Sequence, residues 1–501
     1  MSRYVVVGGG VSGLAAARVL AGARPVSDVA GRQGDPEEGE TWPRPGSFDG
    51  LVLLEASDVL GGKVLTSSFA GGPVELGPDQ FLRRDPSAER LCRLLGLGGD
   101  LVAPGVGAAA VFAAGMPRRL PAGLALGIPT DLDALSASGI VSRGAVDYAR
   151  AEAERPGPLL ERADVGWDGT VPSIDPARER SAGAILRPRL GDEIVDLLVD
   201  PLIGGINAGS IDNLSLGTVA PQIARALVGH KDVIAPLAAA AVAGSPAASP
   251  FLGLAGGLGR FVAAAGAELR LLGCEVRLAC PALRVRSAAS GPGYVVETAG
   301  GEVAADGVVL ALPAGRAASL IEEVVPTAAG HLGEISYSNV AVVTFAVDRP
   351  VPDSLGGLSG VLVPRREGTL TTAVTLLSQK WPWMSAGRAR SLVRVSAGRH
   401  LDARIDSLAD AELSRTLAEE LAVLTGISAD PEDCLVQRWK DAFPQYAPGY
   451  AARLRGIDQA LAERPGLALA GASLGGIGIP ACITSGERAA ETIRGSAVTW
   501  A

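Results

Sequence analysis

Three glycines near the start of the chain place the tightest limit on its fold. Gly8, Gly10 and Gly13 form G-x-G-x-x-G directly after the apolar run 4–7 and directly before the alanine-rich segment LAAARVLA. The run predicts a buried strand and the segment predicts a helix. In such a unit the glycines allow a tight turn, a close approach of a pyrophosphate and close packing of helix on strand. The free amide groups and the dipole at the start of the helix then attract a diphosphate.

A second strand at 51–55 completes a βαβ unit. It ends at Glu55, whose carboxylate is placed to accept hydrogen bonds from the hydroxyls of an adenosine ribose. Residues 24–50 intervene, rich in Gly, Pro and acidic residues without an apolar period, and we interpret them as a surface insertion or a disordered loop. This insertion explains why Glu55 lies farther from Gly13 than the usual spacing of about 20 residues between the glycine turn and the acidic residue.

Composition narrows the class of protein. A chain of 501 residues, 48% hydrophobic, predicts more than one lobe, and a net charge of −9 argues against nucleic acid as the main partner. Five scattered cysteines without a C-x-x-C pair and only three histidines favour a reducing compartment and no metal site. The N-terminus lacks the apolar stretch of a signal peptide. The longest uncharged stretch, 233–259, is broken by prolines and favours a loop with a buried or peripheral helix over a transmembrane segment.

Further along, the pattern changes several times. Residues 90–235 are helical in tendency, strands return from about 250, and the extended runs within 335–400 predict a mixed sheet. Residues 408–426 predict an amphipathic helix ended by Gly426. The C-terminal part predicts a strand, a glycine-rich turn at 471–479 and a helix.

A second glycine pair carries the first resemblance to a known group of proteins. Gly61, Gly62 and Lys63 follow Glu55 closely, and this pair together with the turn at 471–479 resembles flavoproteins of the amine oxidase superfamily. Longer strings are more specific: ELGPDQFL at 75–82, RRLPAGLALGIPTDL at 118–132, RLGDEIVDLLVDPLIGGINAG at 189–209, LSQKWP at 377–382, RWKDAFPQY at 438–446 and GIGIPACITSG at 476–486. In this order they resemble the protoporphyrinogen/coproporphyrinogen oxidase family, in particular its bacterial coproporphyrin-forming type.

The resemblance implies an α/β fold, a two-lobed FAD-binding flavoprotein of Rossmann type with a mixed-sheet substrate lobe and a helical lobe. We expect the FAD-binding part at 1–80, 255–315 and 431–501, the helical/substrate lobe at 81–254 and the mixed-sheet substrate lobe at 316–430. The implied FAD contacts are Gly8, Gly9, Gly10, Val11, Ser12, Gly13, Glu55, Ala56, Lys63, Gly77, Pro78, Asp79, Gln80, Val276, Trp439, Ile477, Gly478 and Ile479.

The implied reaction is the FAD-dependent oxidation of coproporphyrinogen III to coproporphyrin III in haem biosynthesis, with oxygen as electron acceptor. A hydride leaves a methylene bridge of the porphyrinogen for the flavin, so the cofactor carries the difficult step and we single out no catalytic base. The enzyme is expected in the cytoplasm, with peripheral membrane contact left open, and a ferrochelatase is a candidate partner.

The substrate is a polyanion, so local arginines must offset the acidic net charge. Arg83 and Arg84 are the first candidates, because the string before them is expected at the flavin; the others are Arg118, Arg119, Arg187 and Arg189.

Three positions depart from the family pattern, where Asn207 and Leu474 replace aromatic residues and Tyr450 replaces a histidine. These departures bear on substrate choice and turnover, and they keep open a protoporphyrinogen IX oxidase and a non-catalytic porphyrin-binding flavoprotein. Another flavin amine oxidase-type enzyme or a carotenoid desaturase also stays open, because it shares both flavin turns.

Overall fold

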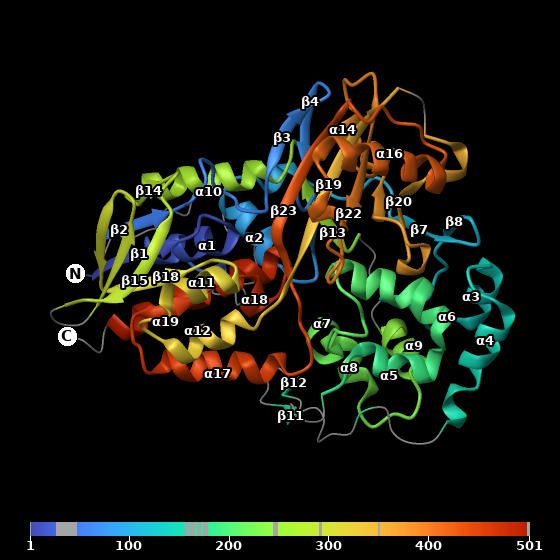
Figure 1. Cartoon of the computed structure of the whole chain (residues 1–501), viewed down its shortest axis with the longest axis horizontal. Coiled ribbons are helices and arrows are strands. Elements are labelled where there is room, and N and C mark those ends of the chain that lie inside the picture. Colours follow the sequence, from blue (N-terminus) through green and yellow to red (C-terminus); the bar gives the residue numbers. More distant parts are fainter. Residues whose placement is uncertain are drawn as a thin grey trace.

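The computed structural model describes residues 2–26, 48–155, 179–243, 249–289, 293–348 and 351–497, together with Leu160 and two short strands at 166–167 and 172–173. Most of the 24–50 segment, 27–47, lies outside the described residues, as does the part of the 233–259 stretch at 244–248. Figure 1 shows a parallel sheet at the end of the molecule that holds both termini, a larger mixed sheet at the opposite end, and a group of helices beside the larger sheet.

The parallel sheet draws its strands from both ends and the middle of the chain. Its order is β14 (Glu275–Arg277), β2 (Phe48–Leu54), β1 (Ser2–Val7), β18 (Gly307–Leu310) and β24 (Leu467–Leu469), all parallel. This order with a reversal beside β1 is that of a dinucleotide-binding sheet. The antiparallel strands β15 (Ala282–Ser287), β16 (Tyr294–Thr298) and β17 (Gly301–Ala305) form a separate small sheet.

Alternate residues of β1 enter two different cores, which explains its uninterrupted apolar run. Tyr4 and Val6 pack with α1 (Val11–Leu20), α10 (Gly259–Leu271) and α19 (Ile479–Ala497) on one face. Val5 and Val7 pack with α11 (Ala314–Ile321), α12 (Pro326–Gly333) and α17 (Tyr450–Ala462) on the other. Helix α2 (Ser87–Leu94) joins the first core. The sheet is therefore covered on both sides, as a parallel sheet requires.

The mixed sheet has seven strands in the order β23 (Cys434–Pro444), β19 (Tyr337–Val347), β22 (Ser391–Ala397), β21 (Thr371–Thr375), β20 (Leu358–Leu362), β7 (Ala108–Ala113) and β8 (Met116–Arg119). Helix α16 (Asp410–Thr425) packs on it and ends at Gly426, which adopts φ +74°, so the predicted helix is confirmed. The connections of the sheet contain short helices: η6 (Asp353–Leu355), η7 (Arg365–Glu367), α13 (Leu377–Lys380), α14 (Pro382–Ser385) and α15 (Arg404–Ser407).

The helical part has its own apolar core. It contains α3 (Leu132–Ser138), α4 (Arg143–Arg150), η3 (Glu152–Glu154), α5 (Ala182–Leu190), α6 (Asp192–Ile194), the π-helix η5 (Val195–Gly204), α7 (Leu216–Val219), α8 (Pro221–Leu227) and α9 (Ile234–Ala243). Helix α9 is the helix expected within 233–259. None of the helices in the described part of the chain has the length and apolar character needed to cross a membrane.

Two parts of the sequence interpretation are corrected. Residues 101–129 are not helical: they form β6 (Leu101–Val102), β7, β8, β9 (Leu124–Ala125) and β10 (Ile128–Pro129). The alanine-rich β7 becomes a strand because it pairs with β20, far away in sequence, and because Ala114 and Gly115, both at positive φ, close a tight hairpin to β8. Likewise β23, within the segment 431–501, lies in the mixed sheet beside β19. The other segment boundaries stay a proposal.

The remaining strands are short. β3 (Thr66–Phe69) pairs with β4 (Gly72–Glu75), β13 (Phe251–Leu254) joins β5 (Phe81–Leu82) to β6, and β11 (Gly166–Trp167) pairs with β12 (Pro172–Ser173). The short helices η2 (Gly98–Asp100) and α18 (Ala472–Gly475) precede β6 and α19.

Candidate nucleotide-binding crevice

The glycine turn between β1 and α1 is closed so tightly that side chains are excluded from it. Gly8 adopts φ +103°, and a Cβ there would overlap the carbonyl oxygen of Ala311. A Cβ on Gly13 would overlap the carbonyl oxygen of Gly8. The turn therefore needs glycine at both positions, and the first amide groups of α1, which have no partner within the helix, are left for a ligand.

Glu55 is held against this turn. Its Oε2 accepts a hydrogen bond from the Gly9 amide at 2.6 Å, and its Oε1 accepts from the amide and hydroxyl of Ser57 at 2.8 Å each. The second glycine pair packs on the first loop, since the Gly61 amide donates to the Gly9 carbonyl at 2.9 Å. The structure thus brings together the two glycine motifs and the carboxylate that the sequence singled out.

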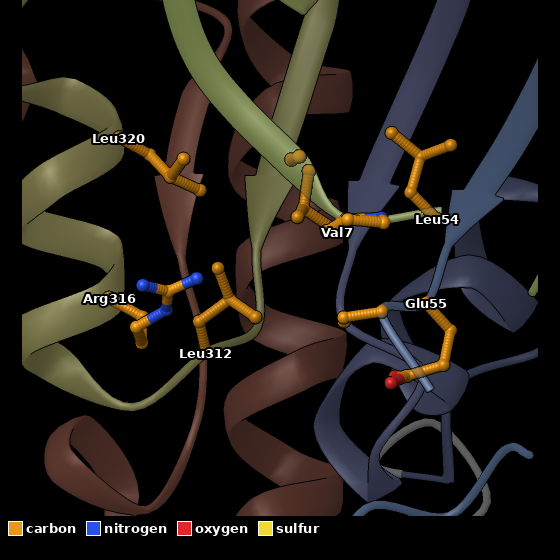
Figure 2. A pocket seen from close by; sticks show the side chains of 10 residues that line it. Val7, Leu54, Glu55, Leu312, Arg316 and Leu320 are labelled. Atoms are coloured by element: carbon orange, nitrogen blue, oxygen red, sulfur yellow. The ribbon is translucent and has the colours of Figure 1, made fainter. Parts of the chain in front are cut away.

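A pocket of about 80 Å³ opens at the carboxyl ends of β1, β2 and β18, the edge where ligands of such sheets bind. Figure 2 shows Glu55 and Arg316 on opposite sides of it, with Val7 and Leu54 on its strands and Leu312 and Leu320 beside Arg316. Gly8, Ala56, Pro281 and Ala282 complete the lining. Sequence reasoning missed Arg316, which lies in α11 outside any recognised motif. Val276 does not line this pocket: it is half-buried on the edge strand β14, opposite Leu53.

The segment 77–80 is fixed by a buried ion cluster. Asp79 accepts from Lys380 Nζ at 2.8 Å, from Trp381 Nε1 at 2.7 Å and from Arg394 Nη2 at 3.2 Å. Burial alone would raise the pKa of Asp79, but Lys380 and Arg394 outweigh it and hold the pKa well below its usual range. Burial lowers the pKa of Lys380 even though Asp79 attracts its positive charge, and the repulsion from Arg394, which shares the same carboxylate, acts in the same direction as burial. The Asp79 side chain is therefore occupied within the protein, and Arg394 Nη1 also donates to the Gly77 carbonyl at 3.0 Å, so this cluster fixes the segment in place.

Two further predicted residues, Lys63 and Trp439, lie near this segment. A Cβ on Gly77 would overlap the Lys63 carbonyl oxygen and lie 3.8 Å from the Trp439 ring. Trp439 Nε1 donates to the Leu76 carbonyl at 2.8 Å. Burial lowers the pKa of Lys63, which faces the opposing pull of Cys482 and Asp441.

The C-terminal turn reaches the N-terminal one through helix packing. Helix α19 begins at Ile479 and presses on α1 so closely that a Cβ on Gly486 would overlap the Ser12 carbonyl oxygen. The half-buried residues 477–479 are thereby carried to the start of α1. The turn is also held from the other side, since Tyr446 Oη donates to the Ala472 carbonyl at 2.6 Å and Tyr450 Oη to that of Ser473.

The departures from the family pattern fit this frame. Tyr450 is fully buried and its hydroxyl supports the C-terminal turn. Asn207 is buried, donates from Nδ2 to the Ile203 carbonyl at 2.8 Å, and receives Gln445 Nε2 on its own carbonyl at 3.0 Å. Leu474 is half-buried in α18. The two polar replacements thus hold main-chain groups.

The candidate arginines are dispersed. Arg83 and Arg84 are exposed, and Arg83 lies 3.4 Å from Glu89. Arg187 pairs with three aspartates, and Arg189 donates to the carbonyls of Glu152 and Arg155. Arg118 and Arg119 lie in β8, at the edge of the mixed sheet. The structure does not bring these side chains together.

Comparison with known proteins decides the family. The model of the family described as "Flavin containing amine oxidoreductase" matches residues 11–494. The chain belongs to this family. It is 33% identical to the coproporphyrinogen III oxidase of Mycobacterium leprae (strain TN), with 98% of each chain covered, and 30% identical to that of Bacillus subtilis (strain 168), with 97% of this chain and 96% of the relative covered.

Solved structures agree with the family assignment. A candidate protoporphyrinogen oxidase from Exiguobacterium sp. 255-15 superposes with a TM-score of 0.79 at 28% identity, covering 98% of each chain. Cyclohexylamine oxidase from Brevibacterium oxydans IH-35A has a TM-score of 0.67 at 17% identity, covering 99% of each chain, and shows the same fold. The predicted two-lobed flavoprotein fold is confirmed.

The residues present fit a flavin dinucleotide, and the family's cofactor here is FAD. The glycine turn leaves the first amide groups of α1 for a diphosphate. Within the segment 77–80, Gln80 Oε1 is buried without a hydrogen-bond partner in the described part of the chain. This oxygen can therefore accept a hydrogen bond from an N–H group of a ligand.

Proposed function

We propose that this flavoprotein oxidises coproporphyrinogen III to coproporphyrin III, with molecular oxygen as the electron acceptor. The observation that carries the proposal is the match to coproporphyrinogen III oxidases over 97–98% of the chain. Bound FAD supplies a hydride acceptor for the methylene bridges of the macrocycle. A substrate that donates hydride to the cofactor needs no activated nucleophile.

The roles of the chain's residues follow from their positions. The amide groups of the 8–13 loop would hold the diphosphate, and Glu55 and Ala56 the ribose. Lys63, Trp439 and the backbones of 77–80 and 477–479 would position the flavin, and Val276 the adenine. Arg83 and Arg84, which are exposed, are proposed to meet substrate carboxylates at the protein surface. These assignments rest on the motifs and on the proximity of the elements.

The test compares substrates on one preparation. Purified protein is expected to be yellow and to raise porphyrin fluorescence when coproporphyrinogen III is added in air, with protoporphyrinogen IX and benzylamine in parallel assays. Faster oxidation of protoporphyrinogen IX would reassign the substrate, and turnover of benzylamine alone would make the chain an amine oxidase. Flavin without turnover of any of the three would favour a porphyrin-binding role.

The proposal extends to the cellular setting. A cytoplasmic site, with peripheral contact at a membrane, suits a chain whose five cysteines are all unpaired. A ferrochelatase is the proposed partner, because the oxidised macrocycle is the form that accepts a metal ion.

A further inference from the structure

Apart from the ion cluster at Asp79, a cluster of basic side chains lies where the helical part meets the mixed sheet. It is formed by Arg365 of η7 and by Arg399 and His400 in the turn after β22. Arg365 Nη2 donates to the Gly209 carbonyl at 3.0 Å, and the His400 amide donates to that of Ala208 at 2.7 Å. The same stretch of chain after η5 therefore receives both residues, which fixes them side by side.

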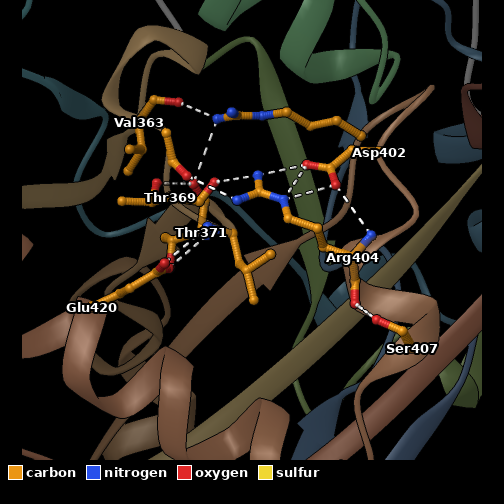
Figure 3. Close-up of polar contacts among 10 residues, drawn as sticks. Val363, Thr369, Thr371, Asp402, Arg404, Ser407 and Glu420 are labelled. Atoms are coloured by element: carbon orange, nitrogen blue, oxygen red, sulfur yellow. Dashed lines mark hydrogen bonds and ion pairs between the residues drawn. The ribbon is translucent and has the colours of Figure 1, made fainter.

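Positive charge exceeds negative charge in this cluster. Arg399 is buried and donates from Nη2 to the carbonyls of Val363 at 2.7 Å and Thr371 at 3.5 Å. Figure 3 shows Val363 and Thr371 beside the Asp402–Arg404 ion pair. No carboxylate of the described residues lies within 4 Å of its nitrogens. Burial lowers the pKa of Arg399 to about 10, with Arg365 adding repulsion.

The nearby carboxylates do not neutralise this charge. Asp402 is engaged by Arg404 through several contacts. Asp200 approaches Arg365 only to 3.9 Å between Oδ2 and Nε, and burial raises its pKa, which disfavours its charged form. The two guanidinium groups thus have only the distant Asp200 and the already engaged Asp402 as nearby carboxylates, an arrangement that attracts an anion.

Unpartnered polar atoms are concentrated at the same place. Arg365 Nε and His400 Nδ1 are buried without hydrogen-bond partners in the part of the chain that the structure describes. Burial, together with Arg365, lowers the pKa of His400, so its imidazole is neutral at neutral pH and offers one N–H donor. Arg365 Nε is a donor, and a buried donor without a hydrogen-bond partner is costly in a folded protein, so it points to a bound group that supplies an acceptor.

The cluster is connected to the cofactor crevice. Asn207, next to Ala208, accepts from Gln445, and the neighbouring Tyr446 donates to Ala472 in the C-terminal glycine turn. Two large apolar side chains adjoin the Ala208–His400 contact in the sequence, Ile206 with 52% and Leu401 with 82% of its surface exposed. An amphipathic ligand with an apolar ring and peripheral carboxylates matches this combination.

We propose that Arg365, Arg399 and His400 form a subsite that binds one peripheral carboxylate of the tetrapyrrole substrate, with Ile206 and Leu401 against the ring edge. The inference rests on the proposed function, because it takes the substrate to be a porphyrinogen. Arg365, 38% exposed, is the member that an incoming carboxylate reaches first. Arg399 is held by main-chain carbonyls, and its buried positive charge adds to the attraction for the carboxylate that Arg365 binds.

The test uses coproporphyrin III, an air-stable tetracarboxylate, as the probe. Its dissociation constant is measured by fluorescence quenching with wild type, R365Q and R366Q, since Arg366 is an exposed neighbour with the same charge in the same turn. We expect roughly tenfold weaker binding for R365Q and under twofold change for R366Q, because a charge-assisted hydrogen bond at a partly exposed site is lost only in the first. R365K should recover part of the affinity.

Parallel kinetics separate the two proposals. If wild type oxidises coproporphyrinogen III but R365Q keeps the wild-type affinity for the probe and KM for the substrate, the subsite is wrong and the function stands. If wild type neither binds the probe nor oxidises the porphyrinogen, the proposed function and the subsite fall together. Flavin absorbance and thermal melting confirm that each variant is folded, and H400A provides a second variant if R365Q does not fold.

Discussion

Replacement of Asp79 by Asn should destabilise the protein strongly. The substitution keeps the shape of the side chain but removes the charge that Lys380 and Arg394 share. These two side chains are each only 10% exposed, and that of Asp79 is 6% exposed, so the remaining cations cannot be rescued by solvent. Breaking a buried pair by removing one partner costs about 3–5 kcal/mol, and we expect D79N to lose this much free energy of unfolding.

Urea unfolding followed by circular dichroism measures the effect, with D133N as the matched control. Asp133 pairs with Arg150 at 2.7 Å, but its side chain is 92% exposed, so its loss should cost less than about 1 kcal/mol. A D79N protein within 1 kcal/mol of wild type would refute the reasoning, because the ion cluster would then not stabilise the fold.

The same cluster predicts a pH dependence. The folded-state pKa of Asp79 is depressed, so its contribution is complete above the ordinary Asp pKa of about 4 and is lost as the pH falls toward the folded value. The stability difference between wild type and D79N should therefore be full at about pH 5 and should shrink as the pH falls below about 4. A difference that grew in acid would contradict the assignment.

Three further results are expected. G13A should abolish flavin retention, measured as the ratio of flavin to protein absorbance, because its Cβ overlaps the turn, whereas G99A, with open space around it, should keep its flavin. Burial raises the pKa of Glu75 to about 7, so the stability of wild type relative to E75Q should fall as pH rises from the ordinary Glu pKa of about 4 toward 7; parallel stability curves would contradict this. The double variant R83A/R84A should raise the KM for coproporphyrinogen III several-fold, and an unchanged KM would leave both as surface charges.

Much of the fold was predictable because the determining interactions are local. The βαβ start, the helix ended by Gly426 and the C-terminal strand–turn–helix each carry their own glycine and apolar signals within a few residues. Residues 101–129 gave the wrong interpretation because an alanine-rich segment has no preference strong enough to resist pairing with a distant strand.

The sequence by itself determined that a phosphate-binding turn follows the first strand, because only glycine at positions 8 and 13 allows that backbone. These residues lie within a few positions of one another, so a short stretch of sequence is enough to predict the turn. Tertiary structure alone decided which charges meet. Asp79 contacts Lys380 and Arg394, which lie hundreds of residues away in the sequence, and Arg365 lies near Arg399, dozens of residues away. No spacing in the chain predicts those contacts. The physical reason is that burial and charge pairing depend on the packing of β22 and its neighbouring turns against the rest of the molecule, which exists only after the sheet has formed.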